Sequence, residues 1–187
     1  TRQNLQVLLH QAGLKESDVT VVVTGLLNFA PLMQGQVDAT AATDTGLAVG
    51  RQRGLGPVHV MEVRQHLNMS SDVFVVREDT YQQRKEVLRR FLQAYRDSMQ
   101  WMIQSPQEAA QLATKVAIDG QNPAINLEII QLRNASSVST LTQQRGLGAI
   151  DVETLQRGAQ VYRQLGIISR ELRMSDVVSQ DLLPGRS

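Results

Sequence analysis

The sequence predicts an α/β fold in which helices cover an open sheet of parallel strands. Helix-like and strand-like patterns alternate along the first 63 residues. The strand-like runs are short and rich in valine and threonine, whereas the helix-like segments repeat their apolar residues at helical spacing. Because parallel strands are joined by crossover helices, this alternation favours a parallel sheet with helices packed on it.

Three helices and three strands are expected in this first part. The first helix has leucines at helical spacing, including Leu5, Leu8 and Leu9, and Gly13 follows as its C-terminal cap. The other elements, in order, are a buried strand at 19–23, a short helix capped by Asn28 and ended by Gly35, a strand at 37–43, a short helix or turn at 46–54 and a strand at 58–63.

A strand at 72–76 comes next, and the rest of the chain is expected to be mostly helical. An apolar stripe from Val87 to Met102 predicts a long helix that begins near Thr80. Further helices are expected after Ser105, after Asn122 and after Asp151, with a polar loop at 133–149.

The helices beyond residue 80 need a surface to cover their apolar stripes, yet only one predicted strand lies in that part. Leaving a side chain such as Phe91, Ile130 or Tyr162 in water forgoes about 1.5–3 kcal/mol. We therefore expect that the chain is a fragment whose stripes are covered by an absent N-terminal segment or by another copy. The alternative is a bundle, which short connections at Ser105 and Gln121 permit.

The composition is that of a globular domain and excludes several classes of function. Apolar residues make up 42% and charged residues 20%, and no apolar run is long enough to cross a membrane. A net charge of +1 gives no general attraction to nucleic acid, so no nucleic-acid partner is expected. The absence of cysteine excludes disulfides, thiolate metal sites and cysteine nucleophiles.

The remaining chemistry favours a binding protein over an enzyme. His10, His59 and His66 lack the spacing of metal ligands, so no metal site is expected. Gly146 and Gly148 form a lone pair of glycines with no strand before them, which is not a dinucleotide fingerprint. No nucleophile elbow is present either. We expect no catalytic residues and no cofactor.

Asp44 is the one acidic residue whose position favours a functional role. It follows the predicted strand at 37–43 and lies between Thr43 and Thr45. It can cap the helix that follows, or it can contact a ligand at the carboxyl end of the sheet. Both interpretations remain open on the sequence alone.

Four segments, in order, resemble periplasmic solute-binding proteins of ABC importers, in the branch for nitrate, sulfonates, taurine and thiamine pyrimidines. They are Leu8–Leu14 with Asp18-Val19-Thr20, Pro31–Ala39, Asp72–Glu78 with Val87–Tyr95, and Ser105–Ala110. The resemblance implies a periplasmic-binding-protein-like fold with two α/β lobes joined by crossing strands. Residues 1–70 would form the second lobe and residues 71–187 the returning half of the first, whose N-terminal part is missing.

The resemblance also implies a binding mechanism and a set of contacts. Hinge closure would hold the ligand in the cleft between the lobes. The crossing segments would supply Thr43, Asp44, Thr45, Ser70, Ser71 and Asp72, and a strand-to-helix junction would supply Thr24, Gly25 and Asn28, whose residue types also suit plain capping.

The function expected from these arguments is solute capture for an ABC import system. The solute would be small and polar or anionic, such as a sulfonate, taurine, nitrate or a pyrimidine precursor. The partner would be the transporter permease, and the location periplasmic or lipid-anchored outside the cytoplasm. The alternatives are an interaction module that forms homo-oligomers without ligand, and the effector-binding domain of a LysR-type regulator.

Overall fold

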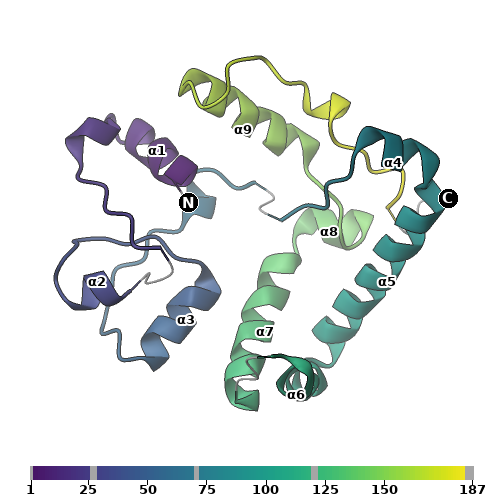
Figure 1. Ribbon diagram of the computed structural model, residues 1–187, viewed down its shortest axis with the longest axis horizontal. Helices are drawn as coiled ribbons and strands as arrows, with labels where there is room; N and C mark the ends of the chain where they lie inside the picture. Colours follow the sequence, from purple (N-terminus) through teal and green to yellow (C-terminus); the bar gives the residue numbers. More distant parts are fainter. Residues whose placement is uncertain (1, 26–28, 70–71, 119–121, 184–187) are drawn as a thin grey trace. The chain divides into compact units, whose positions relative to one another are not determined.

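The computed structural model shows a helical protein (Figure 1) and describes residues 2–25, 29–69, 72–118 and 122–183. Helices make up 59% of it, and the described residues contain no β-strand. The predicted α/β fold with parallel and crossing strands, resembling a periplasmic binding protein, is therefore wrong for this structure. The chain divides into two compact units, 1–69 with 152–177 and 70–151 with 178–187. The assignment of residues 1–70 and 71–187 to two lobes stays a prediction.

The four segments predicted as strands are irregular, and the apolar side chains in them are largely open to solvent. Val23 is 91% exposed and Val75 is 84% exposed, although both lie in runs of β-branched residues. Such runs have a high strand propensity, but a strand also needs a neighbour to accept and donate its backbone hydrogen bonds. The described residues contain no β-strand that could pair with 19–23, 37–43, 58–63 or 72–76.

In its described residues, the first unit contains three helices from the start of the chain and one from near its end. They are α1 (Arg2–Gln11), α2 (Ala30–Met33), α3 (Asp44–Gln52) and α9 (Val152–Gln164), with 3₁₀ turns at Glu16–Asp18, Val63–Gln65 and Met174–Asp176. Val7 is the most deeply buried side chain of α1. Gly13 follows α1 at a positive φ of 72°, as predicted for a C-terminal cap.

Two glycines allow close packing inside this unit. The Phe29 ring lies against α3 at Gly50, where a Cβ would come within 2.8 Å of Cδ2. On α9, the buried Gly158 faces Met69, and a Cβ there would collide with the thioether sulfur. Both contacts are possible because glycine has no side chain, so the Phe29 ring and the Met69 thioether fill the space that a Cβ would occupy.

The second unit is built on α5 (Lys85–Gln104), α6 (Pro106–Val116) and α7 (Pro123–Ser137), which contact one another. In Figure 1, α6 is seen nearly end-on where α5 and α7 come together. Ala109 and Ala110 of α6 and Ile130 of α7 form its buried core, with Met102 and Leu127 packed against them. Small alanines let α6 approach α7 closely. These contacts are those of the bundle alternative for α5 and α7, whereas α9, the third helix of that alternative, belongs to the first unit.

The helix ends of the second unit follow the sequence signals closely. Pro106 occupies the first turn of α6, and the Asn122 side chain accepts a hydrogen bond from Ala124 N at 2.8 Å to cap α7. The long helix predicted from Thr80 is interrupted at Arg84, between α4 (Glu78–Gln83) and α5. The loop predicted at 133–149 is only partly a loop, because α7 continues to Ser137 and α8 (Thr140–Arg145) follows.

Candidate functional site

The N-terminus of α3 brings together three of the predicted ligand contacts. Thr43 is the N-cap residue, and its hydroxyl accepts a hydrogen bond from Gly46 N at 3.1 Å. The same hydroxyl lies 3.1 Å from that of Thr45. Thr43 therefore caps this helix, and Asp44, predicted as a cap or a ligand contact, begins its first turn.

Asp44 accepts a hydrogen bond from one of the free N–H groups at the start of α3. Its Oδ1 accepts a hydrogen bond from Thr45 N at 2.8 Å, which places a negative charge at the positive end of the α3 dipole. Since Gly46 N already bonds to Thr43, the side chains of the cap take two N–H groups that could otherwise bind an anion. This end of α3 therefore presents hydroxyls and a carboxylate, which suit a polar ligand with its own donors.

Arg64 and Glu62 form an ion pair in the same unit. Arg64 donates to Glu62 from Nε at 2.8 Å and from a terminal nitrogen at 3.0 Å. The pKa of Arg64 is raised, first by these hydrogen bonds and the charge of Glu62 and, less strongly, by the charge of Asp44. The group of Glu62, Arg64 and Asp44 is exposed, so salt will screen its interactions.

The other predicted contacts are not gathered at this point. Thr24 is half-buried and precedes Gly25, which is exposed and adopts a positive φ of 61° in a turn. Asp72 belongs to the second unit, where its 89% exposed side chain lies 3.8 Å from Arg133. Asn28, Ser70 and Ser71 lie outside the described residues.

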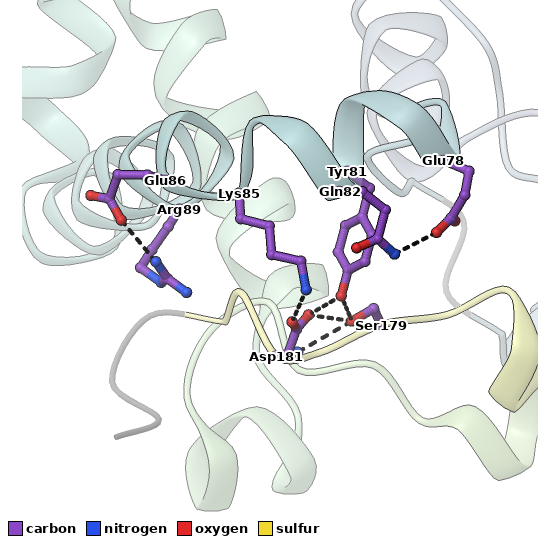
Figure 2. A network of polar contacts seen from close by, with 8 residues as sticks. All are labelled: Glu78, Tyr81, Gln82, Lys85, Glu86, Arg89, Ser179 and Asp181. Carbon is purple, nitrogen blue, oxygen red and sulfur yellow. Dashed lines mark hydrogen bonds and ion pairs between the residues drawn. The ribbon is translucent and has the colours of Figure 1, made fainter.

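A polar network in the second unit has no counterpart in the sequence predictions (Figure 2). Tyr81 Oη donates to Asp181 Oδ1 at 2.6 Å and lies 2.9 Å from the hydroxyl of Ser179, which also bonds to Asp181. Lys85 donates to Asp181 Oδ2 at 3.4 Å, and its Nζ lies 4.5 Å from the Tyr81 ring centroid. These contacts fasten the segment after residue 178 to α4 and α5.

The network has a clear electrostatic effect. The hydroxyls of Ser179 and Tyr81, and then Lys85, lower the pKa of Asp181 from 3.8 to about 2. Hydrogen bonds to the charged form are the main cause. The sequence holds no local signal for this arrangement, because Tyr81 and Asp181 are 100 residues apart. The network anchors the segment after residue 178, and this role explains its contacts without any ligand.

Two shallow concavities lie in the first unit, one lined by the segment after α9 alone and the other by α9 and that segment. They measure 550 and 330 Å³ and share Glu171 and Leu172. The smaller one is lined by side chains at helical spacing on α9, namely Gln156, Ala159, Gln160, Arg163 and Gln164. None of the predicted ligand contacts lines either concavity.

The part of the chain that the structure describes contains no group of three or more histidine, cysteine or acidic side chains placed to hold a metal ion. Across the same residues, no helix combines the length and the apolar character needed to cross a membrane.

Comparison with known proteins defines the class, which is the family that the four sequence segments predicted. Residues 1–109 match the family described as NMT1/THI5 like, and the chain belongs to that family. It is also 25% identical, over 186 residues, to the riboflavin-binding protein RibY of Chloroflexus aurantiacus. That alignment covers 98% of this chain and 53% of the relative, so the chain spans about half the length of the relative. No solved structure matches.

Proposed function

We propose that this protein binds a small polar organic solute outside the cytoplasm, either in the periplasm or at a lipid anchor, and delivers it to an ABC import permease. The observation that carries the proposal is the similarity to a riboflavin-binding protein along 98% of the chain. Family membership over residues 1–109 supports the same role. Capture by hinge closure is part of this proposal, and no catalytic step is.

Riboflavin is the first solute to test, ahead of sulfonates, taurine, nitrate and pyrimidine precursors. Its ring system carries both hydrogen-bond donors and acceptors. The N-terminus of α3 offers the hydroxyls of Thr43 and Thr45 and the carboxylate of Asp44, which match such a ligand better than they match an anion. We propose these three residues, with Thr24 and Gly25 of the same unit, as ligand contacts.

A fluorescence titration tests the proposal directly. Binding should quench riboflavin emission in a saturable way, and Asp44→Asn should weaken binding by about tenfold if one charged hydrogen bond is lost. Asp97→Asn removes an acidic side chain from α5 in the second unit and is the matched control. No saturation with riboflavin would contradict it as the solute, and calorimetry with taurine and nitrate would then test the other classes.

A further inference from the structure

The side chain of Gln156, on α9, holds the segment that follows this helix in the first unit. Its amide nitrogen donates to Leu172 O at 2.9 Å, and its amide oxygen accepts from Met174 N at 2.8 Å. Arg173, between these two residues, has an extended backbone. Gln156 is half-buried and uses both ends of its amide, so it satisfies backbone groups of the segment that no strand pairs with.

A second glutamine makes a similar contact in the second unit. Gln180 is half-buried, and its Oε1 accepts a hydrogen bond from Ile150 N at 3.1 Å. The next residue, Asp181, is held to α4 and α5 by Tyr81 and Lys85. Gln180 thus joins the segment by which the chain returns to this unit to the segment by which it leaves.

The two contacts enclose both of these passages of the chain between the units. The chain leaves the second unit after residue 151 and returns to it after residue 177. Residues 150–156 and 174–180 form two legs of equal length, and the side chains of Gln156 and Gln180 join the legs at either end. Both legs are partly stiffened by local hydrogen bonds, because α9 includes residues 152–156 and a 3₁₀ turn includes residues 174–176.

We propose that the contacts of Gln156 and Gln180 are coupled, so that breaking either contact weakens the other. The physical reason is loop closure. Ile150 and Gln180 are 30 residues apart, but while Gln156 holds the segment at 172–174 their contact closes a loop only about half as long. Each doubling of a loop disfavours its closure by about threefold, so loss of the Gln156 contact should weaken the Gln180 contact by about that factor.

The coupling makes Gln156 and Gln180 positioning residues for the two passages. A movement of one unit relative to the other would bend both passages at once, because neither leg changes independently while both contacts are formed. Neither glutamine is among the proposed solute contacts. A failure of this inference would therefore not bear on the proposed function.

Hydrogen exchange at single amides tests the coupling. Gln156→Met removes the amide and keeps the length of the side chain. Exchange should rise at Met174, whose N–H loses its acceptor, and by about threefold at Ile150 in the other unit. Gln180→Met should raise exchange directly at Ile150 and by the same factor at Met174, because coupling free energies are reciprocal. This reciprocity lets either variant decide alone, and circular dichroism checks that each keeps its helices.

Gln160→Met is the matched control. Gln160 lies one turn further along α9, and its side chain makes no hydrogen bond among the described residues, so exchange at Ile150 and Met174 should stay unchanged. Exchange at Ala110 of α6, in the same unit as Ile150, should also stay unchanged, which excludes general destabilisation. Faster exchange only at the amide that each glutamine contacts, or an equal effect of Gln160→Met on Ile150, would overturn the proposal.

Discussion

The hydroxyl of Tyr81 donates to the carboxylate of Asp181 at 2.6 Å, although 100 residues separate the two along the chain. Tyr81 lies on α4, and Asp181 lies in the segment that returns to the second unit near the end of the chain. Gln180, next to Asp181, accepts a hydrogen bond from Ile150 N at 3.1 Å. Two stretches distant in sequence are thus held together by a few polar side chains.

Tyr81→Phe should loosen the segment after residue 178. The change removes one hydroxyl and leaves the ring, so we expect a loss of about 0.5–1.5 kcal/mol in the free energy of unfolding. Hydrogen exchange at residues 179–183 should rise more than exchange in α6. Tyr95→Phe is the matched control, since the Tyr95 hydroxyl has no partner among the described residues. Equal effects of the two changes would contradict the anchoring role.

Asp181 makes stability depend on pH in acid. Its pKa is about 2 in the folded chain and 3.8 as an ordinary side chain, so the folded state favours the carboxylate. The stabilisation is complete at a pH above the pKa of the unfolded state, and it is lost as the pH falls through the pKa of the folded state. In urea unfolding, the free energy of unfolding should therefore fall less between about pH 4 and pH 2 in Asp181→Asn than in wild type. Parallel pH profiles would exclude this contribution.

Gly50→Ala should destabilise α3 although alanine is the better helix former. The new Cβ would approach Phe29 Cδ2 to 2.8 Å, and such overpacking costs about 1–3 kcal/mol against a helical gain of about 1 kcal/mol. Gly56→Ala is the control, because a Cβ at Gly56 meets nothing within 4 Å. Thermal unfolding of the two variants measures the loss of stability. Phe29→Leu in the Gly50→Ala background should restore part of that stability.

Thr43→Ala should weaken the start of α3 by about 1 kcal/mol, because the N-cap oxygen that accepts from Gly46 N is lost. Thr43→Ser keeps that oxygen and should keep most of the stability. Amide exchange at Thr45 and Gly46 reports the local effect. An unchanged exchange rate in Thr43→Ala would show that the cap contributes little.

The helical half of the sequence prediction succeeded because its signals are local. Gly13 ends α1, Pro106 starts α6 and Asn122 caps α7, and each of these roles is satisfied by residues within one or two turns. The order of four short segments also led to the right family. The helix predicted from Thr80 is instead two helices, because Arg84 leaves the helical conformation between α4 and α5.

The sequence by itself thus determined several helix ends, among them those of α1, α6 and α7 at Gly13, Pro106 and Asn122, because an α-helix satisfies its backbone within the segment. The valine-rich runs 19–23 and 72–76 could become strands only beside a second strand that pairs with their backbone. Strand propensity alone does not provide such a partner. The tertiary structure alone decided that Phe74 packs on Phe91 and that Asp181 meets Tyr81. Such contacts join residues far apart in sequence, so they form only when the tertiary structure closes the long loop between those residues.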